Sequence, residues 1–273
     1  MKLIFFDIDG TLIDEKGNMA KSTPEAIAKA RENGHLCIVN TGRTASLVMD
    51  WLPKLADFDG YLCGCGTHLI FDGKDLLHKS FTAGQSKKII EGLEKYKIDA
   101  ILEGAENDYH NDPEKMYTAV FKDYITSRYK QYHWGSYQDA IGKFDKFYCY
   151  ANDSKSVYRF MDEMSDLLEL IDRGKGFFEI VPTGYSKASA MDRLAKYLNQ
   201  SGKYPVKITR EDYAAIGDST NDLSMLSHAG TAIAMGRSAQ EVLRIADYVT
   251  TDVMNDGIEK ALEFLGVLKN SEK

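Results

Sequence analysis

The chain begins with a short apolar run, Leu-Ile-Phe-Phe at residues 3–6, that stops at Asp7. Such a run predicts a buried strand, and Gly10 predicts that the backbone turns soon after it. Two carboxylates, Asp7 and Asp9, therefore follow the end of the first strand. Comparable strand-like runs recur at residues 35–39, 60–63, 213–216, 231–235 and 248–251.

Helical segments mostly separate these runs. Ser-Thr-Pro at residues 22–24 favours a helix start, and Gly34 favours its end, directly before the second strand. Strands that alternate with helices indicate a parallel, doubly wound α/β sheet of the Rossmann type. Ligands bind such sheets at the carboxyl ends of the strands, where both Asp7 and Thr41 are expected to lie.

The pattern of apolar and polar positions changes between residues 82 and 184. This change predicts a second, smaller α/β domain inserted into the first. Its expected helices cover residues 84–97, 113–131 and 154–167, and its expected strands cover residues 99–102, 145–151, 168–172 and 177–181. The first and larger domain, the core domain, would then consist of residues 1–81 and 185–273. Glycine-containing linkers near residues 81–84 and 182–186 could let the inserted domain close over a site and exclude water.

Further polar residues cluster after the strand-like run at 213–216, in Gly-Asp-Ser-Thr-Asn-Asp at residues 217–222. If this run belongs to the same sheet, Asp218 and Asp222 join Asp7 and Asp9 at one edge. Carboxylates about 4 Å apart repel by roughly 4 kcal/mol per pair at an effective dielectric constant near 20, so the group needs protons, a metal or a basic side chain. Oxygen ligands alone favour Mg²⁺, and Lys187 could add positive charge.

Each motif also has a simpler interpretation. Asp-x-Asp-Gly is common in turns, and Asn221 with Asp222 could be no more than a helix cap. Both motifs nevertheless occur in one chain, each after a predicted strand and with Thr41-Gly42-Arg43 between them. The combination favours a catalytic site.

The order of these motifs resembles the haloacid dehalogenase superfamily, and in particular its Cof-like phosphatases, which carry a large α/β cap between the second and third motifs. The resemblance rests on D-x-D-G-T at 7–11, T-G-R at 41–43, the distant Lys187 and G-D-x-x-N-D at 217–222. It implies that Asp7 is a nucleophile and Asp9 a general acid and base. It also implies that Thr41 and Lys187 bind phosphate.

The same resemblance implies a Mg²⁺ site formed by the Asp7 carboxylate, the Asp9 main-chain carbonyl and Asp218. Asn221 and Asp222 would support the metal shell or Lys187, so Asn221 is grouped with the phosphate-binding residues and Asp222 with the metal ligands. Asn221 and Asp222 come from the same six-residue motif as Asp218. All of these groups would therefore meet at one edge of the sheet.

Three other residues are weaker candidates for substrate contact: Gly42, Arg43 and Glu179. Arg43 could contact substrate or the cap, and a structural salt bridge explains it equally well. Glu179 lies in the stretch that leads back from the inserted domain and could reach a substrate hydroxyl. The chain departs from the pattern of many relatives at Cys65, Ala188 and Arg237, which makes a substrate assignment borrowed from a relative unsafe.

Composition narrows the class of protein. The 273 residues suffice for two domains, and the net charge is −7 without runs of basic residues. This balance argues against nucleic acid or an anionic membrane surface as the main partner. No apolar run has the length of a signal-peptide core or a membrane span, so a cytoplasmic protein is expected. The four cysteines are expected to be buried thiols, because they are few and Cys37 and Cys149 fall within strand-like runs. Cys63 and Cys65 form a close pair, but no second close pair completes a zinc site.

The sequence therefore predicts a Mg²⁺-dependent phosphatase, a phosphoric monoester hydrolase that acts on small phosphorylated metabolites. Sugar phosphates are the first expectation, and an aspartyl-phosphate intermediate would divide one hard displacement into two easier steps. The alternatives are a sugar-phosphate phosphomutase and, in a different class, a noncatalytic phosphometabolite sensor. The partner would be a small phosphate ester, and the protein a monomer or a homodimer.

Overall fold

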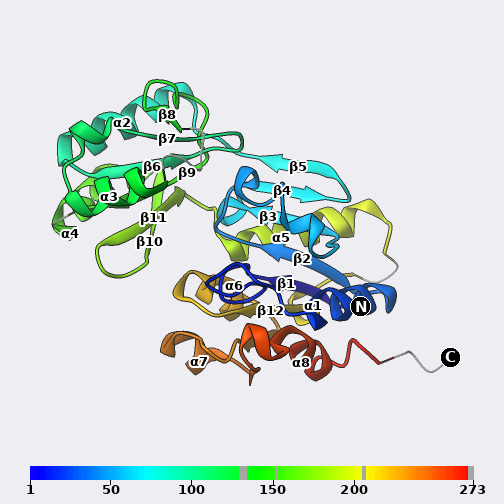
Figure 1. The fold of residues 1–273 in the computed structure, drawn as a ribbon. Coiled ribbons are helices and arrows are strands. Elements are labelled where there is room, and N and C mark those ends of the chain that lie inside the picture. Colours follow the sequence, from blue (N-terminus) through cyan, green and yellow to red (C-terminus); the bar gives the residue numbers. More distant parts are fainter. Residues whose placement is uncertain (129–133, 152, 205–206, 270–273) are drawn as a thin grey trace. The chain divides into compact units, whose positions relative to one another are not determined.

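A computed structural model of the protein describes residues 1–128, 134–151, 153–204 and 207–269 (Figure 1). Contacts divide the chain into two compact units. The first comprises Met1–Arg43, Leu47–Leu77 and Ser186–Lys273, and the second comprises Thr44–Ser46 and His78–Tyr185. Each unit is an α/β structure with its own sheet, as the sequence predicted.

The first unit is built on a sheet with the strand order β14-β13-β12-β1-β2-β3-β4-β5 among the described residues. The six strands from β14 to β3 pair in parallel, which confirms the predicted doubly wound arrangement. The strands are β1 (Leu3–Phe6), β2 (Leu36–Asn40), β3 (Gly60–Cys63), β4 (His68–Phe71), β5 (Lys74–His78), β12 (Tyr213–Gly217), β13 (Thr231–Ala234) and β14 (Tyr248–Val249).

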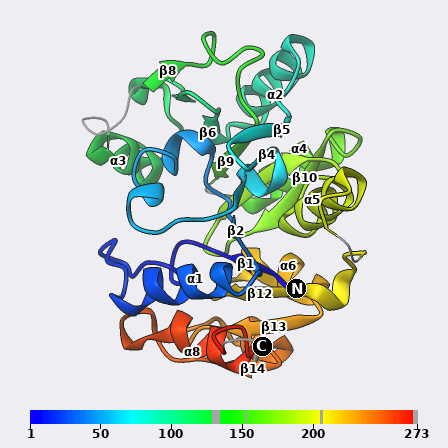
Figure 2. The same cartoon turned by 90° about the vertical axis from the view of Figure 1, so that its right-hand side faces the viewer.

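Helices cover both faces of this sheet. The helices of the unit are α1 (Ser22–Glu32), α5 (Lys187–Ser201), α6 (Leu223–His228), α7 (Gln240–Ile245) and α8 (Gly257–Phe264). Phe5 packs with Leu194 of α5 and Met225 of α6 in one core, whereas the Cys37 thiol contacts the carbonyl of Ile27 in α1. Helices α1 and α8 lie next to each other, as Figures 1 and 2 show. The alternation of side chains along each strand thus fills two cores.

Strand register brings the carboxyl ends of three central strands together. Phe6, the last residue of β1, pairs with Val39 in β2 and with Ile216 in β12. The residues that follow these strands therefore share one edge of the sheet. Asp7, Thr41 and Asp218 all lie there, as the sequence predicted for a site at the strand ends.

The sequence did not anticipate β4 and β5, which extend the sheet beyond β3. Strand β4 runs antiparallel to β3, with Gly60 opposite Phe71. Strands β4 and β5 are short, and the connection from β3 to β4 is only a 3₁₀ turn at Gly64–Gly66. A connection this short cannot return the chain for a parallel pairing, which needs a crossover of a dozen or more residues.

The second unit has a sheet with the strand order β10-β11-β9-β6-β7-β8 among the described residues. Most of its pairs are antiparallel, and β7 with β8 is parallel. Helices α2 and α4 pack against each other and contribute to the main core of the unit. The elements are α2 (Ala83–Tyr96), β6 (Asp99–Glu103), β7 (Asp108–His110), α3 (Ala119–Arg128), β8 (Trp134–Ser136), β9 (Lys146–Tyr150), α4 (Ser154–Glu163), β10 (Leu168–Asp172) and β11 (Phe177–Pro182).

Two expectations for this region were wrong. The predicted helix at 113–131 is a 3₁₀ turn at Pro113–Lys115 followed by α3, and its last predicted residues, 129–131, lie outside the described part of the chain. The break occurs because the Asp99 carboxylate accepts hydrogen bonds from the backbone N–H groups of Tyr117 and Thr118. The stretch near Phe81, predicted as a linker, is also not one: Phe81 packs against Phe144 in the core of the second unit.

All four cysteines, Cys37, Cys63, Cys65 and Cys149, are buried and form no disulfide, as predicted. Burial raises the pKa of the Cys63 thiol to about 12, so this thiol stays protonated at neutral pH. In the described residues, none of the helices combines the length and the apolar character that crossing a bilayer would require.

The sheet of the second unit carries buried charges. The ammonium of Lys146 pairs with the carboxylates of Glu103 and Glu179, the latter at 2.9 Å. Asp108 is opposite Glu103 in the sheet, and its Oδ1 has no hydrogen-bond partner within the described ranges. Burial, followed by the charge of Glu103, raises the pKa of Asp108 to about 8. This carboxyl group is therefore held in its neutral form at pH 7.

This raised pKa predicts a pH-dependent stability effect. An Asp in the unfolded chain has a pKa of about 3.9, whereas the pKa of folded Asp108 is about 8. Between these values the unfolded state binds fewer protons, so this group makes folding less favourable as pH rises. We expect Asp108→Asn, which stays neutral, to raise the melting temperature relative to the unsubstituted protein more at pH 8 than at pH 5.

Thermal unfolding at the two pH values measures this difference. The control is Asp139→Asn in the same unit, because Asp139 is exposed and Ser136 lowers its pKa. Its effect on the melting temperature should be the same at pH 5 and pH 8. An Asp108→Asn effect that is equally independent of pH would contradict the prediction.

Candidate active site

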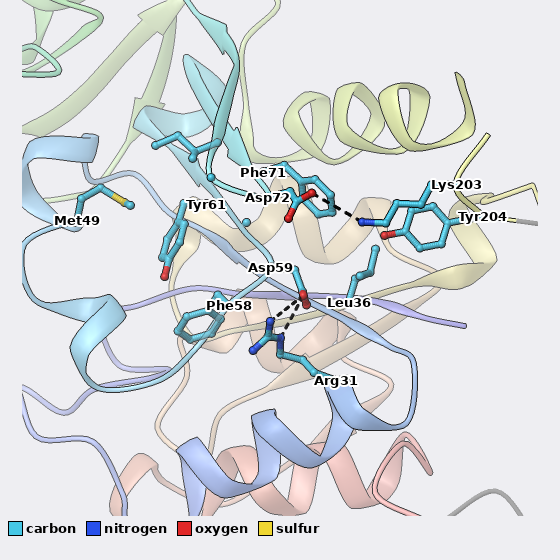
Figure 3. Close-up of a pocket in the computed structure, with 13 residues that line it drawn as sticks. Arg31, Leu36, Met49, Phe58, Asp59, Tyr61, Phe71, Asp72, Lys203 and Tyr204 are labelled. Atoms are coloured by element: carbon cyan, nitrogen blue, oxygen red, sulfur yellow. Dashed lines mark hydrogen bonds and ion pairs between the residues drawn. The ribbon is translucent and has the colours of Figure 1, made fainter. Parts of the chain in front are cut away.

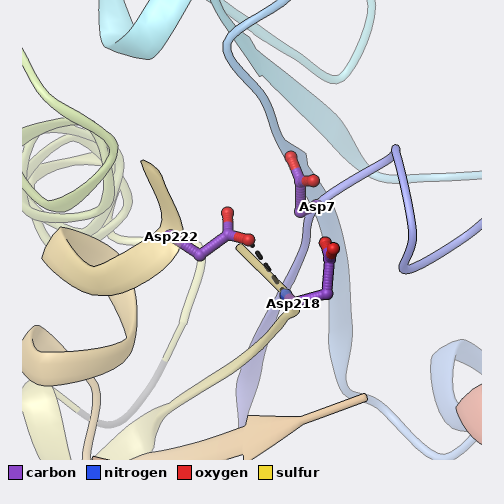
Figure 4. Close-up of side chains that lie close together, drawn as sticks. All are labelled: Asp7, Asp218 and Asp222. Atoms are coloured by element: carbon purple, nitrogen blue, oxygen red, sulfur yellow. Dashed lines mark hydrogen bonds between the residues drawn. The ribbon is translucent and has the colours of Figure 1, made fainter. Parts of the chain in front are cut away.

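Three carboxylates meet at the carboxyl edge of the first unit's sheet: Asp7, Asp218 and Asp222. One oxygen of each lies within 4.8 Å of the others (Figure 4). Asp7 follows β1, Asp218 follows β12, and Asp222 ends the 3₁₀ turn that leads into α6. Asp7 and Asp222 are buried, and Asp218 is partly exposed. Residues more than 200 positions apart in the sequence thus form one acidic group.

Lys187 supplies the positive charge for this group. It is the first residue of α5, whose start is fixed by the capping side chain of Ser186. Its Nζ donates to Asp7 Oδ1 at 2.6 Å and to Asp222 Oδ1 at 2.5 Å, and its side chain is fully buried. Burial alone would lower the pKa of Lys187, but the charges of Asp222 and Asp7 raise it above the usual range. The ammonium therefore stays charged at neutral pH.

Both oxygens of Asp222 are already engaged. Oδ1 accepts from Lys187, and Oδ2 accepts from the backbone N–H groups of Asp218 and Ser219, each at 3.0 Å. Asp222 is completely buried. It consequently holds Lys187 and the turn that carries Asp218, and the second oxygens of Asp7 and Asp218 are better placed to bind a metal.

Burial and electrostatic repulsion both act on the carboxyl groups of Asp7 and Asp218. Burial, followed by the charge of Asp222, raises the pKa of Asp7 to about 7. The same two causes raise the pKa of Asp218 to about 8, and Asp7 adds to the effect. One ammonium does not neutralise three carboxylates. The group therefore favours an additional cation, and an all-oxygen donor set fits Mg²⁺.

Gly10 allows Asp218 to approach the first strand. Its φ is +78°, in the left-handed region, and a Cβ at this position would lie 2.7 Å from Cγ of Asp218. The Thr11 hydroxyl donates to Asp218 Oδ1 at 3.3 Å. The Gly-Thr pair after the two aspartates thus has a structural purpose: the glycine leaves space for the carboxylate, and the threonine orients it.

Thr41 lies at the end of β2 and is almost completely buried. Its Oγ1 accepts from the backbone N–H of Arg43 at 3.1 Å, so the hydroxyl proton can be donated to another group. Asn40, which the sequence did not single out, donates from its side chain to the carbonyl of Lys187 at 3.0 Å. A buried polar residue at the end of an apolar strand was the signal for Asn40. It ties β2 to the start of α5.

Asp9 departs from the expected group of four carboxylates. Its side chain is 59% exposed and pairs with Arg43, with Arg43 Nε at 2.8 Å from Oδ2 and Arg43 Nη2 at 2.6 Å from Oδ1. The carboxylate therefore does not belong to the group of Asp7, Asp218 and Asp222. The salt bridge that the sequence allowed for Arg43 is present, and its partner is Asp9.

The other candidates lie as follows. The Asn221 amide oxygen accepts from the Ser219 hydroxyl at 2.5 Å, within the turn that carries Asp218. Gly42 lies in the bend between Thr41 and Arg43. Glu179 lies in β11 of the second unit, where it is buried and ion-paired with Lys146.

A separate pocket of about 260 Å³ lies within the first unit, at the amino ends of β2 and β3 (Figure 3). Its lining includes Tyr61, Phe71 and the ion pair between Arg31 and Asp59. The three carboxylates and Lys187 are absent from its lining. The candidate active site is therefore the opposite edge of the sheet, where the strands end.

The chain is similar to known proteins along nearly its whole length. The family model for haloacid dehalogenase-like hydrolases matches residues 4–262. The chain is 25% identical to a putative phosphatase, YkrA, of Bacillus subtilis, over 98% of this chain and 99% of that protein. It is 27% identical to the pyridoxal phosphate phosphatase YbhA of Escherichia coli, over 94% of this chain and 96% of that protein.

A solved structure of a sugar phosphatase of HAD subclass IIB superimposes with a TM-score of 0.79 at 24% identity, covering 98% of this chain and 100% of the other, and shares the fold. The family match spans both parts of the first unit, which carry the acidic group and Lys187, and the second unit between them. This chain belongs to the haloacid dehalogenase-like hydrolases.

Proposed function

We propose that the protein is a Mg²⁺-dependent phosphatase that hydrolyses small phosphate esters through an aspartyl-phosphate intermediate. The observation that carries the proposal is the buried contact of Lys187 with both Asp7 and Asp222, beside the partly exposed Asp218. This arrangement combines a carboxylate nucleophile with a positive charge. Phosphoryl transfer depends mainly on such positioning and charge neutralisation.

In the first step, a carboxylate oxygen of Asp7 attacks phosphorus in line with the ester oxygen. An O–P bond to Asp7 forms, the ester P–O bond breaks, and the leaving oxygen takes a proton from Asp9. Lys187 and the Thr41 hydroxyl stabilise the negative charge on the phosphoryl oxygens. Lys187 also orients Asp7, because it already donates to Asp7 Oδ1.

In the second step, Asp9 removes a proton from water. The water oxygen forms a bond to phosphorus, the O–P bond to Asp7 breaks, and inorganic phosphate leaves. Asp7 returns as a carboxylate, and Asp9 again carries the proton needed for the next leaving group. One side chain thus performs both proton transfers.

Asp7, Asp218 and the Asp9 main-chain carbonyl would hold the Mg²⁺ ion, with Asn221 supporting the turn that carries Asp218. When bound, Mg²⁺ would neutralise negative charge on the transferring phosphoryl group. Asp222 is assigned to Lys187, because both of its oxygens are occupied by N–H donors.

The substrates are proposed to be small phosphorylated metabolites, with sugar phosphates first. The second unit is assigned the role of a cap, which would restrict the site to small esters and exclude water during transfer. A relative that acts on pyridoxal phosphate and a fold neighbour that acts on sugar phosphates support small metabolites as the class. Gly42 and Glu179 are retained as candidates for substrate contact.

Removing the nucleophile tests the mechanism. We expect Asp7→Asn to lower kcat for Mg²⁺-dependent hydrolysis by about 10⁴-fold or more, because the amide cannot form the phosphoenzyme. A panel of phosphate esters, each assayed with Mg²⁺ and with EDTA, measures the loss.

The control for this test is Asp59→Asn, at the opposite edge of the same sheet, where Asp59 pairs with Arg31. It should leave kcat within about twofold, as expected for a residue remote from the chemistry. Full activity of Asp7→Asn, or hydrolysis unaffected by EDTA in the unsubstituted protein, would refute the proposal.

A second test uses the space that Gly10 leaves. Gly10→Ala should cost about 1–2 kcal/mol of stability because of its left-handed backbone, and it should also displace Asp218. We expect the Mg²⁺ concentration for half-maximal activity to rise by about tenfold or more. Chemical denaturation and a Mg²⁺ titration of activity give the two quantities.

Gly17→Ala is the matched control, because Gly17 has a φ of +81° and nothing within 4 Å of the added Cβ. It should show a similar stability cost with an unchanged Mg²⁺ requirement. Identical Mg²⁺ titrations for the two variants would contradict the assignment of Asp218 to the metal.

A further inference from the structure

The ion pair between Asp9 and Arg43 has a geometry that the proposed chemistry must accommodate. Arg43 donates from Nε to one oxygen of Asp9 and from Nη2 to the other. Such a bidentate pair fixes the plane of the carboxylate as well as its position. Asp9 is therefore oriented by Arg43, whereas Asp7 is oriented by Lys187.

Arg43 is itself held by the loop that carries Thr41. Its backbone N–H donates to Thr41 Oγ1 at 3.1 Å, and its carbonyl accepts from the N–H of Gly64 at 2.8 Å. The guanidinium carbon lies 5.6 Å from the ring centre of Trp51, within cation–π range. The direction of the Asp9 carboxylate is thus linked to the proposed phosphate-binding loop.

The pairing suits one of the two proton transfers better than the other. Both oxygens of Asp9 accept hydrogen bonds from a cation, so the carboxylate is arranged as an acceptor. A base needs this form to take a proton from water. Proton donation to a leaving group instead needs a proton on one of these oxygens, which competes with the Arg43 contact.

Building on the function proposed above, we propose that Arg43 is a positioning residue that holds Asp9 as the base for the second half-reaction. In that step a water proton moves to Asp9, the water oxygen bonds to phosphorus, and the bond from phosphorus to Asp7 breaks. The pair is partly exposed, with Arg43 32% and Asp9 59% accessible, and such pairs are weak. Asp9 can therefore leave Arg43 when it must carry a proton.

The test separates the two half-reactions with p-nitrophenyl phosphate, whose leaving group departs without a proton. We expect Arg43→Met to form the phosphoenzyme at a rate within about threefold of the unsubstituted protein. Its phosphoenzyme should decay about tenfold more slowly or worse, because general base catalysis contributes on the order of 10²–10⁴-fold and only its orientation is lost. Rapid-quench measurement of the burst and of phosphoenzyme decay gives both rates.

Two further variants make the result specific. Arg43→Lys keeps the charge but not the bidentate fork, so it should restore decay only in part. Arg31→Met removes another Arg–Asp pair, with Asp59, from an arginine that is also 32% accessible but lies at the opposite edge of the sheet. It should leave both rates unchanged, which excludes a general effect of losing such a pair.

The outcomes distinguish the possible roles. Slow decay with a normal burst supports the proposal. A rise in KM with unchanged decay would mean that Arg43 only contacts substrate, and faster decay would mean that it restrains Asp9; either result overturns the proposal. If the unsubstituted protein forms no phosphoenzyme, the proposed function itself fails, and this is visible before any Arg43 variant is compared.

Discussion

The buried ammonium of Lys187 is the constraint around which the first unit is arranged. A charge without access to water is tolerated only when it is paired and hydrogen-bonded, and Lys187 has Asp7 on one side and Asp222 on the other. These three residues come from β1, α5 and the turn before α6. Displacing any of these elements would leave a buried charge without its partner, so the pairing fixes the edge of the sheet where catalysis is proposed.

The same constraint divides the acidic residues by purpose. Both oxygens of Asp222 accept hydrogen bonds from N–H donors, whereas Asp7 and Asp218 have oxygens that can bind other ligands. The group remains too negative for one ammonium, which explains why burial and mutual repulsion raise the pKa of Asp7 and of Asp218. The negative charge that remains is consistent with the proposed binding of a divalent cation.

The fold and the specificity of such a protein have different origins. A relative named for pyridoxal phosphate and a fold neighbour named for sugar phosphates both align over nearly the whole chain. The alignment extends over the second unit, whose sheet carries the buried Lys146 and Glu179 and the partly exposed Glu103. Function depends on side chains placed on a fold, so the shared architecture does not identify the substrate.

The sequence by itself determined the alternation of the main strands and helices in the first unit, the parallel sheet and the edge at which Asp7, Thr41 and Asp218 lie. These follow from local patterns, because an apolar run followed by a polar residue marks the end of a buried strand. It also placed Lys187 near these carboxylates through the resemblance of its motifs. The antiparallel β4 and the break before α3 were missed, because pairing and a remote carboxylate, Asp99, decide them.

Only the tertiary structure decided which carboxylate faces which cation. Asp9 lies two residues from Asp7, yet it pairs with Arg43, while Asp222 turns to Lys187. The pattern of residues along the chain specifies which edge of the sheet a side chain reaches. It does not specify the direction in which the side chain points at that edge. That direction results from competition among charges and N–H donors that come from distant parts of the chain, and burial decides which pairings must be satisfied.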